Sequence, residues 1–175
     1  MYNEVIHFWF NELTPSDWFI DSIHIDQIII ERFGSLHKQA VQGELYEWRF
    51  SSQGGLAAII ILDQFSRNIH RGHSKSFDND GMALVLAQNM IEKQQDKQLI
   101  PNMKAFCYLP FMHSESQIIH KNALELYNQV GLEQYLEYEL KHKVIIDKFG
   151  RYPHRNPILG RFSTQEELDF LKTSF

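Results

Sequence analysis

The chain has 175 residues, of which 43% are hydrophobic and 22% are charged, and its formal net charge is −5. A chain of this length is typical of one globular domain that buries a sufficient core without disulfides or a structural metal. The acidic balance, with a pI near 6.0, argues against general binding of nucleic acid, for which a strongly basic domain is expected.

The single cysteine, Cys107, excludes an intramolecular disulfide and is compatible with a reducing compartment. The longest apolar run, Leu56 to Leu62, is far shorter than the ~20 residues of a membrane span. The first residues lack the basic and apolar pattern of a signal peptide. We therefore expect a cytoplasmic protein without a membrane partner.

Apolar residues in the first half of the chain recur every three or four residues, which is the spacing of amphipathic helices. This pattern predicts helices over residues 3–10, 23–33, 35–42 and 56–69, with Gly34 ending the second of them. The segment 56–69 is apolar nearly all round at its start, as in a central buried helix. Its β-branched residues 59–61 leave a buried strand as the competing interpretation, but its length favours a helix.

The same spacing in the second half predicts helices over residues 77–94, 101–109, 114–130, 132–149 and 163–171. Pro110 is expected to break the second of these helices. Ser114 and Ser163 are each followed three residues later by Gln or Glu, the capping-box spacing of a helix start. On the helix over 132–149, Leu140 and Val144 are expected to face inward. About eight helices without strand alternation predict one all-α domain, residues 1–175, built from antiparallel helix pairs.

Residues 148–161, KFGRYPHRNPILGR, form a basic segment without any acidic residue in an otherwise acidic protein. Two prolines and two glycines make a regular helix or a central strand unlikely there. We therefore predict an irregular cationic loop that accepts an anion. Its candidate ligand-binding residues are Arg151, Arg155, Asn156 and Arg161, and His154 is a candidate acid or base.

Residues 62–72, LDQFSRNIHRG, carry a second polar cluster on the apolar central helix. Asp63, Arg67 and Arg71 follow one another at i,i+4 steps, and Asn68 lies beside them. Asp63 can orient Arg67, whose planar guanidinium binds carboxylate or phosphate through two hydrogen bonds. The structural alternative is an ion pair that ties two helices together.

His113 and Glu115 lie on either side of Ser114, the predicted start of a helix, and are candidates for acid–base chemistry, since the ordinary pKa of histidine is ~6.5. The structural alternative is that this segment only starts a helix. The nine histidines include no HExxH pattern, and a cysteine cluster is absent, so we expect no metal. The sequence also lacks the glycine-rich phosphate-binding motifs, so we expect no nucleotide cofactor.

Several motifs together resemble the bacterial DUF924 family. They are IHFWF at residues 6–10, WF at 18–19, RFG at 32–34, LDQFSRNIHRG at 62–72, LPFMHSE at 109–115 and FGRYPHRNPILGRFSTQEE at 149–167. This resemblance implies a helical fold similar to tetratricopeptide (TPR) repeats and brings no established activity. The family commonly has proline at the position of Ser66.

Two functions follow as hypotheses. The first is a pocket for a small metabolite that carries phosphate or carboxylate, with arginine donors and with His113, Glu115 and His154 available to assist hydrolysis. The second is an interaction module whose basic loop docks an acidic peptide, because arrays of helix pairs often present such grooves. Contact with RNA through the basic loop and its aromatic residues is the weakest of the alternatives, given the negative net charge.

Overall fold

A computed structural model describes residues 1–174, and every regular element in that range is helical, which confirms the all-α prediction. The first half contains α1 (Tyr2–His7), α2 (Ile23–Val41), α3 (Ser52–Ile60) and α4 (Ser66–Ile69), with π-helical turns at Phe8–Glu12 and Ile61–Phe65 and a 3₁₀ segment at Tyr46–Phe50. The second half contains α5 (Asp80–Glu92), α6 (Pro101–Met112), α7 (Gln117–Tyr127), α8 (Glu133–Phe149) and α9 (Gln165–Ser174), with a 3₁₀ turn at Pro153–Arg155.

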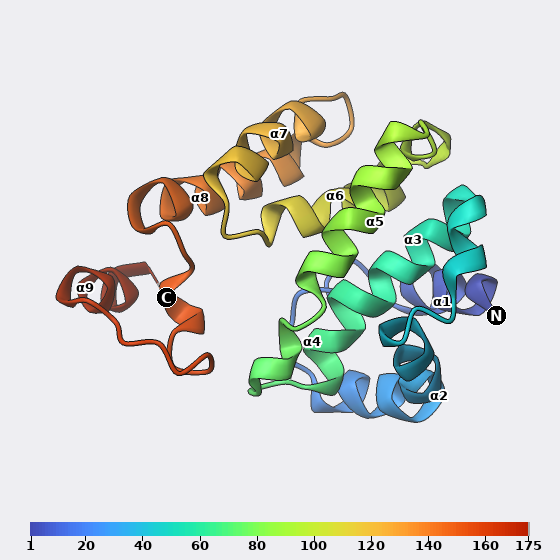
Figure 1. The fold of residues 1–175 in the computed structure, drawn as a ribbon, viewed down its shortest axis with the longest axis horizontal. Coiled ribbons are helices and arrows are strands. Elements are labelled where there is room, and N and C mark those ends of the chain that lie inside the picture. The colour runs from blue at the N-terminus through green and yellow to red at the C-terminus, as the bar shows by residue number, and fades with distance from the viewer. Residues whose placement is uncertain (175) are drawn as a thin grey trace.

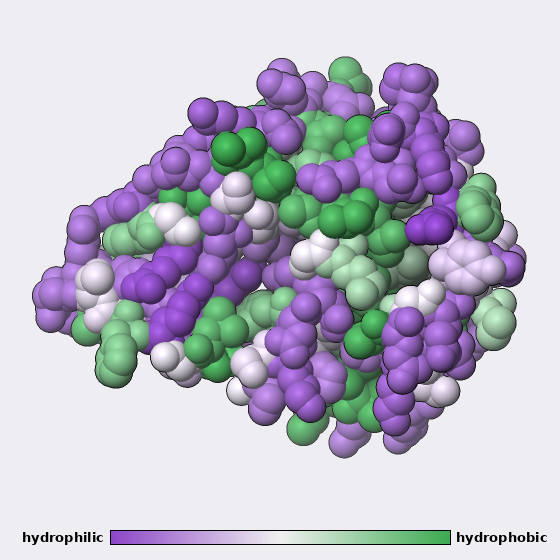
Figure 2. Space-filling view, viewed as in Figure 1, coloured by the Kyte–Doolittle hydropathy of each residue, from purple (hydrophilic) through white to green (hydrophobic). Residues whose placement is uncertain are grey.

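The helix α3 lies at the centre of the molecule, beside α5 and in contact with α1 and α6 (Figure 1). The helices α7 and α8 pack against each other at one end, and α9 lies beyond them, far from the N-terminus (Figure 1). On the face shown in Figure 2, hydrophilic residues dominate and apolar residues gather toward the middle. No helix within residues 1–174 is long and apolar enough to cross a membrane.

The core is built on the apolar run of α3 and on aromatic side chains from distant segments. Residues 54–65 are all buried, which confirms the central buried helix predicted from this stretch. Trp9 meets Phe65 and Phe106 edge to face, with each pair of ring centroids 5.7 Å apart. Such pairs stabilise a core by about 0.5–1.5 kcal/mol beyond the effect of the buried area alone.

Two predicted helix ends are wrong. Gly34 lies inside a continuous α2, since it keeps a helical backbone and the apolar face continues through His37 and Ala40 into the core. Pro110 also lies inside a helix, because α6 runs on to Met112. Residues 105–112 are all buried, so tertiary packing offsets the helix-breaking tendency of proline there.

Helix starts and one buried face also differ from the predictions. The helix α7 begins at Gln117, not at Ser114, whose backbone carbonyl accepts a hydrogen bond from His120 instead. The last helix has its capping box one residue later than predicted, between Thr164 and Glu167. Leu140 and Val144 are 49% and 64% exposed, because α8 turns Tyr135, Glu139 and Ile146 toward the core.

Candidate functional site

The π-helical turn Ile61–Phe65 interrupts the central helix and carries the buried carboxylate Asp63, which is only 1% exposed. Such turns are rare within α-helices and occur frequently at functional sites, where they reorient a side chain. A charge in this position is costly unless it is paired. The local backbone therefore places a carboxylate inside the protein, where it requires polar partners.

Asp63 accepts hydrogen bonds from two side chains and forms an ion pair with a third. Its Oδ1 lies 2.7 Å from His113 Nδ1 and 3.2 Å from Arg67 Nη1, and its Oδ2 accepts from Gln64 at 2.5 Å. Burial alone would raise the pKa of Asp63, but the charge of Arg67 and the hydrogen bonds from His113 and Gln64 outweigh that effect and hold it well below its ordinary value. Asp63 is therefore ionised at neutral pH.

His113 follows the end of α6 and forms a buried pair with Asp63. Burial lowers the pKa of His113, although Asp63 opposes that effect, so the ring is neutral at pH 7. Because an ionised carboxylate only accepts hydrogen bonds, the proton lies on Nδ1 and the lone pair on Nε2. The side chain is 17% exposed, so part of it is accessible to solvent.

Arg155, on the 3₁₀ turn that follows α8, closes the other side of the site. Its guanidinium packs against the rings of Phe77 and Tyr152, with Cζ 4.5 and 4.6 Å from their centroids. Its Nη2 donates to the His113 carbonyl at 3.1 Å, and its Nη1 donates to Asp80 at 3.3 Å. Its Nε is buried and has no hydrogen-bond partner among residues 1–174.

The charge of Arg155 is poorly compensated. Asp80, its carboxylate partner, already binds Arg67 through two shorter hydrogen bonds of 2.9 and 3.0 Å. Burial lowers the pKa of Arg155, although Asp80 opposes that effect. With a side chain that is only 8% exposed, this guanidinium is a buried cation with spare donors.

Two cavities meet at His113. A cavity of about 350 Å³ has a mixed polar lining that includes Phe77, Asp78, Asp80, His113, Glu115, Arg155 and Leu159. A second cavity of about 310 Å³ is mainly apolar and is lined by Phe19, Leu109, Met112, His113, Tyr135, Tyr138 and His142. We call the first the polar cavity and the second the aromatic cavity. His113 is the residue common to both.

Asn68 and Arg71 point away from this site and connect helices. Arg71 binds both oxygens of Asp26 in α2, at 2.6 and 2.8 Å, and also pairs with Asp21. Asn68 donates to the same Asp26 at 2.8 Å. These two residues therefore join α4 and the turn after it to α2, which is the structural alternative considered for residues 62–72.

The charges of the basic loop pair with carboxylates of neighbouring segments. Arg151 forms two hydrogen bonds to Glu167, at 2.7 and 2.9 Å. Arg161 binds both oxygens of Glu115, at 2.6 and 2.9 Å, and also donates to Asn156 at 2.8 Å. These contacts fold the loop onto the start of α9 and onto the segment before α7.

His154 and Glu115 contribute less to the site than the sequence suggested. The His154 side chain is exposed beside the Tyr152 ring, 5.5 Å between centroids, and lines neither cavity. Glu115 lines the polar cavity, but Arg161 and the Tyr152 backbone N–H bind it. The site therefore consists of Asp63, Arg67, His113 and Arg155 of the predicted residues.

Sequence reasoning missed Asp80 and Phe77 as residues of the site. It also missed the fully buried pair of His120 and Glu139, whose Nδ1 and Oε1 lie 2.6 Å apart. His120 Nε2 lies 2.8 Å from the Ser114 carbonyl, so this pair fixes the backbone next to His113. His120 and Glu139 lie on neighbouring helices, and no local pattern indicates their contact.

The comparisons place the chain in a family. Residues 5–174 match the family described as bacterial protein of unknown function, DUF924. The chain belongs to the DUF924 family. It is similar to a solved structure of a protein of unknown function from Agrobacterium tumefaciens, with 32% sequence identity and a TM-score of 0.93 over 98% of this chain and 96% of that chain. A search of curated proteins found no match.

Members of the DUF924 family carry no assigned activity in these descriptions, so the site has to be interpreted from its own chemistry. Within residues 1–174, no group of three or more histidine, cysteine or acidic side chains is arranged to hold a metal ion. The groups available at the polar cavity are an oriented neutral imidazole and an incompletely paired guanidinium. Together they suit general base catalysis and the binding of a negative charge.

Proposed function

We propose that this protein binds a small molecule bearing a phosphate or carboxylate group in the polar cavity and hydrolyses it with His113 as general base. The observation that carries the proposal is the contact of the Asp63–His113 pair with a cavity that Arg155 also lines. Asp63 orients the imidazole, and Arg155 supplies the positive charge.

Binding of an anion follows from the state of Arg155. Its guanidinium already packs against the rings of Phe77 and Tyr152, so little side-chain entropy is lost when a ligand binds. Its two terminal nitrogens carry four N–H donors, of which two are used in hydrogen bonds. An anionic group therefore supplies the charge and the acceptors that Asp80 provides only weakly.

The other lining residues restrict the rest of the ligand. Asp78, Asp80 and Glu115 also line the polar cavity, so a ligand with several negative charges would be repelled there. We infer a ligand with one anionic group and with hydroxyl or amine donors that face these carboxylates. A sugar phosphate or an amino acid derivative has this combination of groups.

The hydrolytic step uses the arrangement of His113. Nε2 accepts a proton from water while the water oxygen bonds to the phosphorus or carbonyl carbon of an ester. Asp63 accepts the hydrogen bond from Nδ1–H and stabilises the imidazolium that forms. The imidazolium then returns the proton to the departing alkoxide as the ester bond breaks, so no cofactor is consumed.

Hydrolysis is tested with 4-nitrophenyl phosphate and 4-nitrophenyl acetate. We expect His113→Gln to lower kcat at least 100-fold, the usual effect of losing a general base, and Lys141→Gln, an exposed cation on α8, to leave it unchanged. Absence of nitrophenol release from both esters with the wild-type protein, above the rate of the His113→Gln variant, would contradict the catalytic role.

Binding is tested separately by thermal shift with inorganic phosphate, sugar phosphates and N-acyl amino acids. A compound that raises the Tm of the wild type and of Lys141→Gln, but not of Arg155→Gln, supports the site. Equal shifts in the Arg155→Gln variant would place the compound elsewhere. The other function considered, docking of acidic peptides by the basic loop, has less support because Glu167 and Glu115 already neutralise Arg151 and Arg161.

A further inference from the structure

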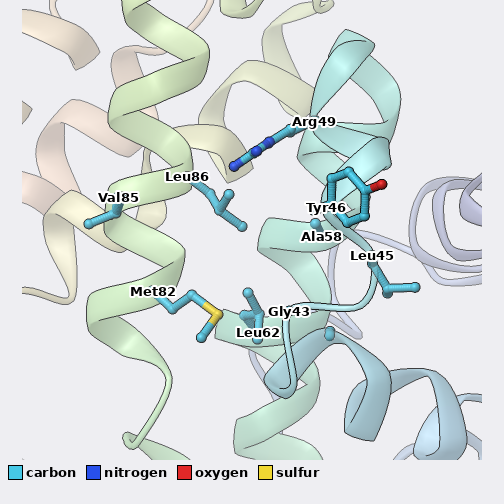
Figure 3. Close-up of a pocket in the computed structure, with 10 residues that line it drawn as sticks. Gly43, Leu45, Tyr46, Arg49, Ala58, Leu62, Met82, Val85 and Leu86 are labelled. Atoms are coloured by element: carbon cyan, nitrogen blue, oxygen red, sulfur yellow. The ribbon is translucent and has the colours of Figure 1, made fainter.

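A third cavity of about 250 Å³ lies on a different part of the protein, between the 3₁₀ segment Tyr46–Phe50, α3 and α5 (Figure 3). None of the residues that line it lines the polar or the aromatic cavity. We call it the Arg49 cleft. Its size is near the lower end for sites that bind small molecules.

The walls of the Arg49 cleft are apolar. Ala58 and Leu62 are buried at its floor, and Met82 and Leu86 of α5 extend toward it from one side (Figure 3). Val85 of α5 also belongs to its lining. The opposite side is formed by Leu45 and Tyr46 (Figure 3). Among residues 1–174, no carboxylate lines the cleft, and its only polar side chains are those of Tyr46 and Arg49.

Apolar side chains around the Arg49 cleft are exposed to solvent. Tyr46 is 55% exposed, Val85 62%, and Met82 41%, and the neighbouring Phe50 is 67% exposed. Apolar residues that gather around a recess are a feature of binding sites, whereas apolar residues exposed singly are ordinary on protein surfaces. Covering this surface would therefore be favourable.

Arg49 extends from the 3₁₀ segment over the cleft toward α5 (Figure 3). Its guanidinium lies 5.9 Å from the centroid of Tyr46 and 6.0 Å from that of Phe50. Within residues 1–174 it forms no ion pair, whereas each of the other arginines pairs with a carboxylate: Arg32, Arg67, Arg71, Arg151, Arg155 and Arg161. The cleft therefore combines an apolar body with one positive charge at its edge.

We propose that the Arg49 cleft binds a medium-chain fatty acid, with the aliphatic chain between α5 and the 3₁₀ segment and the carboxylate on Arg49. A single negative group on an otherwise apolar molecule complements these walls. A peptide fits less well, because its backbone N–H and C=O groups would enter a cleft that offers them few partners. The flexible side chain of Met82 adapts readily to an aliphatic chain.

The test is isothermal titration calorimetry of the full chain with decanoate below its micelle concentration. We expect saturable binding of decanoate to the wild type, and at least fivefold weaker binding of decyltrimethylammonium, whose head group has the opposite charge. Arg49→Gln is expected to weaken decanoate binding about fivefold, as for one partly exposed charge pair. Val85→Glu, a change at an exposed position, is expected to abolish it.

Two control variants assign the site. Lys141→Gln removes an exposed cation that also lies beside a tyrosine, with Nζ 5.7 Å from the Tyr138 centroid, and it should bind decanoate like the wild type. Arg155→Gln should do so as well, because the polar cavity is separate. The proposal is overturned if decanoate fails to saturate the wild type, if Arg49→Gln and Val85→Glu bind it unchanged, or if Arg155→Gln is the variant that loses it.

Discussion

Substitution of Asp63 by asparagine removes a buried charge and keeps the shape of the side chain. Asp63 accepts hydrogen bonds from His113 and Gln64 and forms an ion pair with Arg67. An amide has one acceptor oxygen instead of two, and its NH₂ group would face donors. At least one buried donor is therefore left without an acceptor, and Arg67 loses one of its two carboxylates.

The expected loss follows from the burial of these groups. Removing one partner of a buried ion pair costs about 3–5 kcal/mol. Asp80 still binds Arg67 through two hydrogen bonds, so we expect a value at the lower end, about 3 kcal/mol. For a chain of this size, about 2–4 °C per kcal/mol corresponds to a decrease in Tm of roughly 6–12 °C.

Urea denaturation and calorimetry measure this difference, with Asp147→Asn as the control. Asp147 is 48% exposed and pairs with Lys143, so its substitution should cost less than about 0.5 kcal/mol. Because the pKa of Asp63 is lowered in the folded state, its stabilisation is complete above the unfolded value of about 3.9 and is lost as the pH falls further.

The free-energy difference between wild type and Asp63→Asn should therefore be largest at neutral pH and should shrink below pH ~4. A difference below about 1 kcal/mol at pH 7 would refute the reasoning, because it would mean that breaking the pair leaves no buried charge without a partner. A loss in the Asp147→Asn variant equal to that of Asp63→Asn would refute it as well.

Three further predictions concern stability. Burial lowers the pKa of His37 to about 4, so between pH ~6.5 and 4 only the unfolded state takes up a proton at this residue. The free energy of unfolding should therefore fall by up to about 1.4 kcal/mol per pH unit over that range, and urea denaturation of His37→Gln should show a flatter dependence of stability on pH. Glu115→Gln breaks the paired contact with Arg161, and hydrogen exchange in residues 150–163 should become at least tenfold faster, while unchanged exchange would show that the contact does not hold the loop. An added Cβ at Gly34 meets open space within a helix, whereas at Gly54 it would lie 2.3 Å from a backbone oxygen. Thermal unfolding should therefore show that Gly34→Ala is stabilised by about 0.5–1 kcal/mol and that Gly54→Ala is destabilised. The opposite order of the two variants would contradict the packing described.

The sequence determined the helical fold and its central helix, because these depend on local periodicity. Apolar residues at three- and four-residue spacing predict a helix wherever it packs, and the run from Leu56 to Leu62 is apolar on all sides, so it has to be buried. The sequence also identified Asp63 and Arg67 as candidates, since charged residues are costly on a buried helix. It identified His113 by its ordinary pKa near neutrality and Arg155 by its place in the basic segment.

Tertiary structure decided which of the polar residues share a site. Arg67 and Arg71 are one helical turn apart in sequence, yet Arg67 binds Asp80 of α5 and Arg71 binds Asp26 of α2. The helix α4 ends at Ile69, so Arg71 lies beyond the helix that carries Arg67. The spacing of the two arginines in the sequence does not indicate which helix packs beside each of them. The functional interpretation of Arg71 and the structural one were therefore equally open.

The basic loop illustrates the same limit. Its lack of acidic residues predicted a positively charged surface, but Glu115 and Glu167, which lie outside the loop, neutralise Arg161 and Arg151. Only Arg155 is buried with incomplete pairing, because its carboxylate partner is shared with Arg67. The local sequence determined the helices and the number of charged residues. The packing of distant segments determined which charged residue is incompletely paired, because pairing depends on distances between segments that the order of residues along the chain does not give.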